Sequence, residues 1–274
     1  MFADYHVHCD HSPDCHVPMA EQLRRAAALG ITDLCMTDHI ELGLDEWGDE
    51  VIDLMAYRQE FEALRGQFPQ LRLRFGVEVG ISCPEHHWAQ LLEMMQAMEY
   101  DFVIVSAHTL HGKNVLKALP YEGDGLARVC REYIPSILPR LTRLDPSLYS
   151  CVGHIDFPLK GALRCHAPCT EYRYNFAPEA MDALFRYIID QGKCLELNTS
   201  PWGLMPPGQI SRPDWLRRYA QLGGEYITIG SDSHLTQNTG AFFREAAALA
   251  REAGVKYLAV YEKMKPTFYP LSRI

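Results

Sequence analysis

Short apolar segments alternate with longer amphipathic segments along the chain, and this alternation narrows the possible folds more than any other feature. The apolar segments have strand length and cover residues 2–8, 32–37, 71–79, 101–106, 150–153, 193–198 and 226–230. The segments with helical spacing or helix-boundary residues cover residues 18–29, 51–68, 84–98, 122–144, 178–191, 214–222 and 240–253. This strand–helix repeat predicts a parallel sheet with right-handed crossovers. Because no linker is rich in Pro, Gly or Ser, we expect residues 1–274 to form a single domain, a closed or nearly closed barrel.

Four local features add detail to this pattern. Pro135 and Pro139 are expected to interrupt the helix that contains them. Residues 155–176 predict an irregular loop. The stretch from Ser211 to Asp214 resembles a capping box that begins the next helix. The tail is expected to hold one more short strand, near residues 257–260.

The composition excludes several classes of function. The 274 residues are 47% hydrophobic and 22% charged, as is typical of a soluble globular protein. The net charge of −9 argues against nucleic acid as the main partner. The sequence contains no run of about 18 apolar residues that would predict a membrane span, and it begins without a signal segment. Nine cysteines, scattered and odd in number, favour a reducing cytoplasm over a disulfide scaffold.

Asp4, His6 and His8 alternate along the first predicted strand, so their side chains share one face. Two imidazoles with a carboxylate behind them form half of a metal site, although an ordinary strand with a polar face is the alternative. The metal interpretation is favoured because six of the seven strands, the first included, end near a residue that can bind a metal. On the later strands these residues are His39, Glu78, His108, His154, Asp232 and His234. The carboxyl ends of barrel strands meet at one face, where active sites lie.

The same residues form a recognisable series of motifs. In chain order they are Asp-x-His-x-His (4–8), Thr-Asp-His (37–39), Gly-x-Glu (76–78), the single His108, Gly-His (153–154) and Ser-Asp-x-His (231–234). This series, which covers essentially the whole chain, resembles the PHP (polymerase and histidinol phosphatase) superfamily. Within it, Ser-Pro-Asp (12–14), Gly-His-Ile-Asp (153–156), Leu-Glu-Leu-Asn-Thr (195–199) and Tyr-Pro-Leu-Ser-Arg (269–273) resemble the histidinol-phosphate phosphatase branch.

The resemblance implies a distorted (β/α)7 barrel, similar to a TIM barrel, that holds two to three divalent metal ions. Carried over by matching positions, the first metal would be bound by His6, His8, Glu78 and Asp232. A second would share Glu78 and add His108 and His154, and a third would use Asp14, His39 and His234. The chain departs from the family pattern at His11 and at residues 199–202, so the resemblance carries over the metal ligands but not the details of the substrate pocket.

The expected chemistry follows from these ligands. Mixed imidazole and carboxylate ligands suit Zn, Mn or Fe. Two close metals lower the pKa of a bridging water, and the resulting hydroxide can attack the phosphorus of a phosphomonoester. Glu78 is the expected bridging ligand, and Glu78, Asp232 and His234 are the candidate catalytic residues. Either Asp232 or a metal-bound water would handle the proton.

Several further residues are candidates for contact with a small phosphorylated substrate. Lys160 would neutralise the phosphate, or it is a solvated loop lysine. Asn198 shares a strand face with Glu196, and both would contact substrate or simply fill the barrel. His111 is a third candidate because it follows the ligand His108 closely. Cys165, His166 and Cys169 have the spacing of a small zinc loop, but a surface loop with free thiols is the favoured interpretation.

The resemblance implies hydrolysis of L-histidinol phosphate, a step of histidine biosynthesis, as the activity. Another phosphomonoester or phosphotyrosine is the alternative within the phosphatases. A C–N hydrolase of the amidohydrolase type also begins with His-x-His, but the Glu78 bridge and the Ser-Asp-x-His ending argue against it. The complete set of ligands argues against an inactive metal-binding module.

Overall fold

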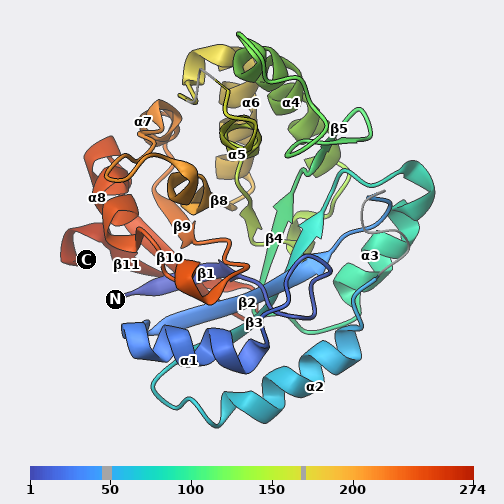
Figure 1. The fold of residues 1–274 in the computed structure, drawn as a ribbon, viewed down its shortest axis with the longest axis vertical. Coiled ribbons are helices and arrows are strands. Elements are labelled where there is room, and N and C mark those ends of the chain that lie inside the picture. The colour runs from blue at the N-terminus through green and yellow to red at the C-terminus, as the bar shows by residue number, and fades with distance from the viewer. Residues whose placement is uncertain (45–50, 168–170) are drawn as a thin grey trace.

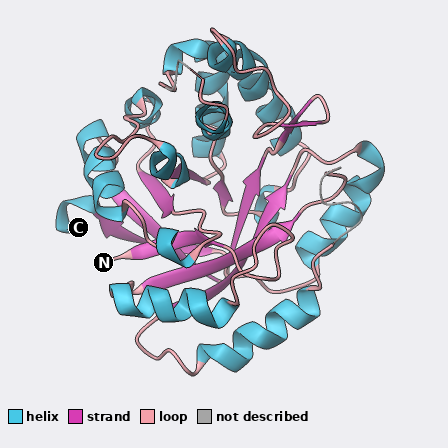
Figure 2. Cartoon of the chain, in the orientation of Figure 1, coloured by secondary structure: helices cyan, strands magenta, loops and turns pink. Residues whose placement is uncertain are grey.

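A computed structural model describes residues 1–44, 51–167 and 171–274, and its centre is a nine-stranded sheet (Figures 1 and 2). In spatial order the strands are β1 (Ala3–Val7), β2 (Asp33–Ile40), β3 (Arg72–Gly80), β4 (Phe102–Ser106), β7 (Cys151–Val152), β8 (Cys194–Asn198), β9 (Tyr226–Gly230), β10 (Tyr257–Glu262) and β11 (Lys265–Pro270). The short strands β5 (Thr109–Leu110) and β6 (Lys113–Asn114) form a separate antiparallel hairpin.

The strands from β1 to β9 in this order pair in parallel, which confirms the parallel sheet predicted from the alternation. The first strand also meets the segment that follows β9, through one parallel bridge between Val7 and Ser233. There the His8 amide donates to the Ser233 carbonyl at 3.0 Å, and the Ser233 amide donates to the His6 carbonyl at 3.3 Å. The first strand and the segment after β9 therefore come together beside the carboxyl ends of the strands.

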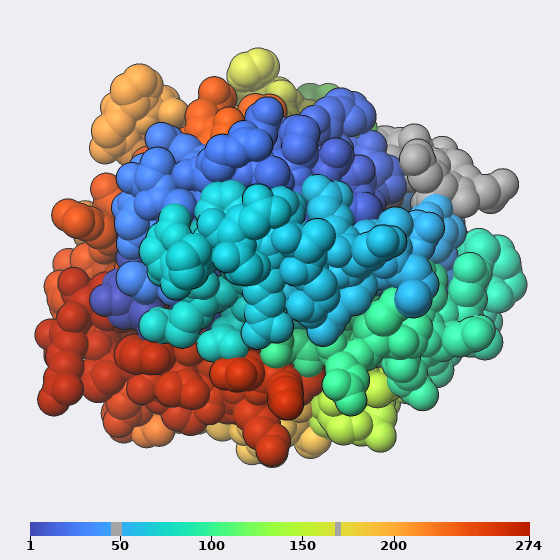
Figure 3. All heavy atoms as spheres, turned by 90° about the horizontal axis from the view of Figure 1, so that it is seen from below, coloured from blue at the N-terminus to red at the C-terminus, as the bar shows by residue number. Residues whose placement is uncertain are grey.

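Eight α-helices in the described residues surround the sheet (Figure 1). They are α1 (Met19–Leu29), α2 (Leu54–Arg65), α3 (Trp88–Gln96), α4 (Gly125–Leu141), α5 (Phe157–Arg164), α6 (Pro178–Asp190), α7 (Asp214–Gln221) and α8 (Phe243–Ala253). Figure 3 shows α1 and α2, in blue and cyan, packed together over one face, with the red C-terminal segment beside them. Within the described residues, no helix has both the length and the apolar character needed to cross a membrane.

Most strands are buried along their length, as expected for a parallel sheet covered by helices. All eight residues of β2 and all five residues of β1, β4 and β8 are buried. Helix α2 buries Leu54, Tyr57 and Phe61, which recur at helical spacing on one side. The sheet therefore forms a dense core on which the side chains at the strand ends are held in fixed positions.

The structure corrects three of the local expectations. Helix α4 continues through Pro135 and Pro139, because both prolines lie on its exposed side while a buried stripe packs against the protein. Residues 155–176 are not an irregular loop throughout, since α5 lies within them. Helix α7 begins after Pro213 without a side-chain cap, so the predicted capping box is wrong.

The C-terminal tail contains more regular structure than expected. The strand predicted near residues 257–260 is β10, and the chain then turns back to form β11, which was not predicted. The turn between them places Lys263 and Met264 in the left-handed region, with φ of 50° and 63°. Hairpin turns of this kind usually contain glycine or asparagine, so the sequence carried no turn signal at this point.

Candidate metal centre

Glu78, near the end of β3, lies at the centre of a buried cluster of imidazoles. Its carboxylate is 1% exposed. Imidazole nitrogens surround its two oxygens: His154 Nε2 at 2.8 Å, His6 Nε2 at 3.0 Å, His39 Nδ1 at 3.2 Å, His108 Nε2 at 3.2 Å and His8 Nε2 at 3.5 Å. The parallel register places His39 directly beside Glu78 on the neighbouring strand. The strand ends thus bring together residues from five separate segments.

Asp232 adds a second buried carboxylate from the loop after β9. Its backbone is left-handed, with φ of 49°, a conformation that aspartate tolerates better than most residues. Oδ1 lies 3.4 Å from His8 Nε2 and 3.8 Å from His6 Nε2. Oδ2 accepts hydrogen bonds from Lys160 Nζ at 2.6 Å and Ser200 Oγ at 3.0 Å. One oxygen therefore faces the imidazoles, and the other is held by α5 and by the turn after β8.

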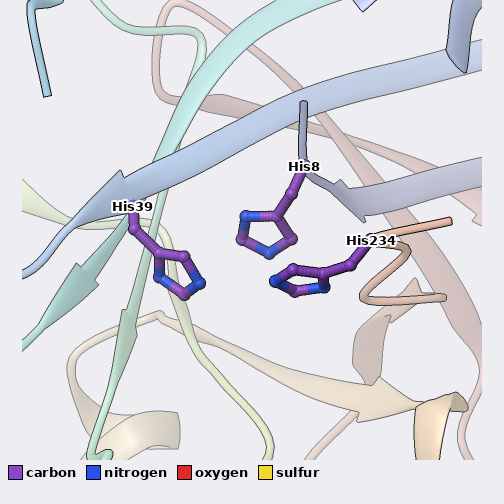
Figure 4. Close-up of side chains that lie close together, drawn as sticks. All are labelled: His8, His39 and His234. Carbon is purple, nitrogen blue, oxygen red and sulfur yellow. The ribbon is translucent and has the colours of Figure 1, made fainter. Parts of the chain in front are cut away.

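The third carboxylate, Asp14, lies on the more open side of the cluster. Its Oδ2 is 3.1 Å from His234 Nε2, and its Oδ1 is 3.6 Å from His39 Nε2. Figure 4 shows the rings of His8, His39 and His234 turned toward one another. The His8 ring centroid lies 4.3 Å from that of His39 and 4.1 Å from that of His234.

The geometry allows several groups of these side chains to hold a cation. Four groups have donor atoms within 4.8 Å of one another: His8–His39–His234, His6–His8–Asp232, His6–His154–Glu196 and His39–Glu78–His108. The buried Nε2 of His8 has no hydrogen-bond partner, although two carboxylate oxygens lie within 3.5 Å. A buried imidazole nitrogen without a hydrogen bond, close to two carboxylates, is suited to bind a transition metal. Mixed imidazole and carboxylate donors suit Zn, Mn and Fe.

The protonation states of three residues in the cluster, Glu78, His8 and His39, also favour a cation. Burial alone would raise the pKa of Glu78, but His6, His108 and His39 hold it well below its usual range. Burial and the neighbouring His234 lower the pKa of His8 to about 4. Burial and His8 lower that of His39 to about 3. At neutral pH, Glu78 is therefore ionised while His8 and His39 are neutral, and these are the forms that bind metals.

A second layer of polar groups lies behind the imidazoles. Glu41 Oε2 lies 2.5 Å from His108 Nδ1, and Glu196 Oε1 lies 2.6 Å from His6 Nδ1. Against the effect of burial, Glu41 and Glu78 raise the pKa of His108 to about 10. The sequence analysis missed Glu41. The available signal was its position two residues after His39, on the same face of a strand.

Beside the cluster is an open cavity of about 390 Å³. Glu78, Asp232 and His234 reach its wall, and leucines form much of the rest: Leu44, Leu116, Leu204 and Leu235. Helix α5 contributes Phe157, Lys160 and Arg164, and the Phe157 ring stacks on that of His154 at 4.5 Å. Lys160 is 8% exposed and paired with Asp232, so it is not a solvated loop lysine. These three residues follow the helical spacing i, i+3, i+7, but in so short a helix this spacing is a weak signal.

Two predicted substrate contacts lie elsewhere among the described residues. Asn198 is buried, donates to Glu196 Oε2 at 3.2 Å and accepts from the Ser200 amide at 2.9 Å; it is not part of the cavity wall. The His111 side chain is 71% exposed and pairs with Glu132 on α4 at 2.8 Å, also outside the wall.

Two further sequence features, Asp4 and the segment with Cys165 and Cys169, lie apart from the imidazoles or are only partly described. The Asp4 carboxylate accepts hydrogen bonds from Ser231 and from the Gly240 amide, so it anchors the loop after β9 rather than an imidazole. Cys165 is exposed and free. Cys169 lies outside the described residues, so the favoured interpretation, a surface loop with free thiols, stays a prediction and the zinc loop its alternative.

The fold is therefore that of an α/β protein, and a cluster of side chains suited to metal binding lies at the carboxyl ends of its parallel strands. The chain belongs to the PHP domain family, which matches residues 4–200. Histidinol-phosphatase of Lactococcus lactis subsp. lactis (strain IL1403) is 26% identical over 266 residues, 96% of this chain and 95% of that protein. A probable histidinol-phosphatase of Clostridium acetobutylicum is 27% identical over 256 residues, 93% of this chain and 95% of that protein.

Solved structures show the same fold. The crystal structure of histidinol phosphate phosphatase from Lactococcus lactis, complexed with Zn, L-histidinol and phosphate, matches with a TM-score of 0.81 and 24% identity, covering 97% of this chain and 98% of that one. The putative histidinol phosphatase from Listeria monocytogenes matches with a TM-score of 0.70 and 18% identity, covering 89% of this chain and 99% of that one. These matches confirm the predicted α/β class and the PHP fold.

Proposed function

We propose that the chain is a metal-dependent phosphomonoesterase that hydrolyses L-histidinol phosphate to L-histidinol and phosphate, a step of histidine biosynthesis. The observation that carries the proposal is the convergence of imidazoles on Glu78 beside a cavity lined by Lys160 and Arg164. Curated relatives that match along nearly their whole length are named histidinol-phosphatase or probable histidinol-phosphatase, which supports this substrate. The Lactococcus structure that holds Zn, L-histidinol and phosphate supports it further.

The ligand sets are also part of the proposal. Two to three divalent ions, of Zn, Mn or Fe, are bound by three groups of residues, of which the first two share Glu78. The first group is His6, His8, Glu78 and Asp232; the second is Glu78, His108 and His154; the third is Asp14, His39 and His234. When bound, such ions supply Lewis acidity, which makes water a nucleophile at neutral pH and balances the charge of a phosphoryl group.

The side chains around the cavity then bind and orient the substrate. Lys160 Nζ has three donors, of which Asp232 uses one, so the ammonium can also donate to a phosphate oxygen. Arg164 lies one turn further along α5 on the same cavity wall. The two cations neutralise the phosphate, while the leucines of the wall exclude water around the carbon skeleton of the alcohol.

Asp232 is the proposed group for proton transfer, and His234 is the neighbour that positions it. Asp232 Oδ1 lies 3.4 Å from His234 Nδ1, and both residues reach the cavity. Burial opposes ionisation of Asp232, but Lys160 and His6 hold its pKa well below the usual range. The ionised carboxylate accepts the proton of the attacking water, unless a metal-bound water takes that role, and the same proton then passes to the leaving oxygen.

We also propose a single-domain enzyme that works in the cytoplasm. The cysteines in the described residues are all free, in keeping with a reducing compartment.

The test is the release of inorganic phosphate from about ten phosphomonoesters, with histidinol phosphate and phosphotyrosine among them. The protein should be purified without chelator and assayed with added Zn²⁺ and with added Mn²⁺. We expect the highest kcat/KM for histidinol phosphate. A higher kcat/KM for another ester would show that this ester, and not histidinol phosphate, is the substrate. If no ester releases phosphate with either added metal, the phosphatase proposal is overturned.

A further inference from the structure

Two imidazoles of the cluster share an arrangement that the proposed ligand sets do not explain. His108 and His6 each direct Nε2 toward Glu78, at 3.2 Å and 3.0 Å. Each directs Nδ1 at a further carboxylate, Glu41 for His108 and Glu196 for His6. The side chains of these two glutamates are only 2% and 1% exposed. Carboxylates are almost never buried in this way without a hydrogen-bonding or oppositely charged partner.

Glycine makes the space for both carboxylates. A Cβ added to Gly80 would lie 1.9 to 2.2 Å from the carboxylate atoms of Glu41. A Cβ added to Gly230 would lie 2.4 Å from Glu196 Oε1. Gly80 and Gly230 end β3 and β9, the strands beside those from which Glu41 and Glu196 project. At each place where a glutamate reaches an imidazole, the neighbouring strand therefore has a glycine, whose missing side chain leaves room for the carboxylate.

We propose that Glu41 and Glu196 are positioning residues for the metal centre. An ionised carboxylate can only accept hydrogen bonds, so in the metal-bound centre each keeps a proton on Nδ1 and leaves the lone pair of Nε2 for the ion. Each hydrogen bond also fixes the ring plane and raises the basicity of the nitrogen that faces the centre. Glu196 Oε2 further accepts from the backbone amide of His154 at 2.8 Å, which ties the main chain at a third proposed ligand to the same carboxylate.

This inference depends on the metal centre of the proposed function and not on its substrate. It is tested by the affinity of the metal-free protein for Zn²⁺, measured by competition with a chromophoric chelator at a temperature far below unfolding. Glu41→Ala removes the acceptor and should weaken the tightest affected site about 10- to 100-fold. Glu41→Gln keeps an acceptor oxygen and should recover part of this loss. Glu196→Gln should likewise weaken binding, by a smaller factor than an alanine would.

A glycine substitution provides an independent variant. Gly80→Ala retains Glu41 and its charge but displaces its carboxylate, so it should weaken Zn²⁺ binding as Glu41→Ala does. Gly66→Ala is the matched control, because a Cβ there meets nothing within 4 Å and should leave binding unchanged.

The outcomes separate positioning from a purely structural role. A structural role predicts lower melting temperatures with unchanged Zn²⁺ affinity, and that result in both Glu41→Ala and Gly80→Ala would overturn the inference. Equal losses in Glu41→Ala and Glu41→Gln would also overturn it, because the hydrogen bond would then contribute nothing. Because Zn²⁺ binding is measured without substrate, a wrong substrate assignment would leave the result unaffected.

Discussion

The Lys160 ammonium lies 2.6 Å from Oδ2 of Asp232, whose Oδ1 faces the imidazoles. The lysine therefore stands between the cavity and the candidate metal centre, with contacts available to both. This geometry explains how a cation from a short helix can be kept almost completely buried. It also gives Lys160 two possible effects when it is removed, one on substrate and one on the carboxylate.

We expect Lys160→Met to raise KM for histidinol phosphate about 10- to 100-fold, because a charge-assisted contact contributes roughly 1.5–3 kcal/mol. The metal content should change little, since Asp232 keeps its other neighbours. Steady-state kinetics and elemental analysis check this. Lys113→Met is the control, because Lys113 is exposed and lies outside the cavity wall. Unchanged kinetics in Lys160→Met would show that its role is confined to the ion pair.

Glu78→Gln tests the proposed bridge between two metals. The amide keeps the shape of the side chain but removes the negative charge that holds two cations close together. We expect kcat to fall at least about a thousandfold, as when a main electrostatic contribution is lost. At least one metal per chain should also be lost, with the fold retained. Glu93→Gln, on the exposed side of α3, is the control. Near-normal turnover with full metal content would place the bridge elsewhere.

Metal removal should abolish phosphatase activity and lower the melting temperature. Ions present at about a thousand times their Kd add roughly 4 kcal/mol to the free energy of unfolding. At about 2–4 °C per kcal/mol, this predicts a fall of roughly 10 °C on dialysis against chelator. Calorimetry before and after dialysis measures it, and added Zn²⁺ or Mn²⁺ should restore both properties. If the melting temperature does not change on dialysis, although elemental analysis shows that the protein is metal-free, the assignment of the buried residues as metal ligands would be contradicted.

Asp182 on α6 makes a separate prediction about acid stability. Its carboxylate accepts hydrogen bonds from Arg218 Nε on α7 at 2.8 Å and from the Tyr174 hydroxyl at 2.7 Å. The bond from Arg218 has the larger effect, and both bonds lower the pKa of Asp182. A lowered pKa in the folded state stabilises the fold above the ordinary aspartate value of about 3.9, and the contribution is lost as pH falls below it.

Asp182→Asn should therefore have a lower melting temperature than the natural protein at pH 7. The difference should shrink as the pH falls below about 4. Thermal unfolding at a series of pH values measures this, with Asp190→Asn at the end of α6 as a control. A difference that is constant with pH would mean that the charge of Asp182 contributes nothing to stability.

The strand ends were predictable because a strand alternates its side chains with a period of two, and parallel strands share a carboxyl edge. His6 and His8, and the single ligand-type residues on later strands, follow from these two rules. The rules could not place His111, because only a few residues beyond a strand end the chain enters the β5–β6 hairpin and turns outward. Closeness in sequence to His108 therefore does not mean closeness in space.

The cavity wall was harder to predict for another physical reason. Helix α5 has only eight residues, too few for its periodicity to stand out beside the polar segment around it. Its place comes from tertiary packing, as the stacking of Phe157 on His154 shows. Glu41 was missed although it continues the strand alternation of His39, because its role depends on Gly80 of the next strand.

The single bridge between Val7 and Ser233 has a consequence for the order in which the molecule is assembled. An ion bound by His8 and Asp232, as proposed above, would join the same two segments, which are separated by more than two hundred residues of chain. Like a cross-link that closes a long loop, it restricts the unfolded chain far more than a contact between neighbours would. Such an ion could therefore bind only after residues 8 and 232 have come together, so it would stabilise the closed arrangement of these two segments over the unfolded chain.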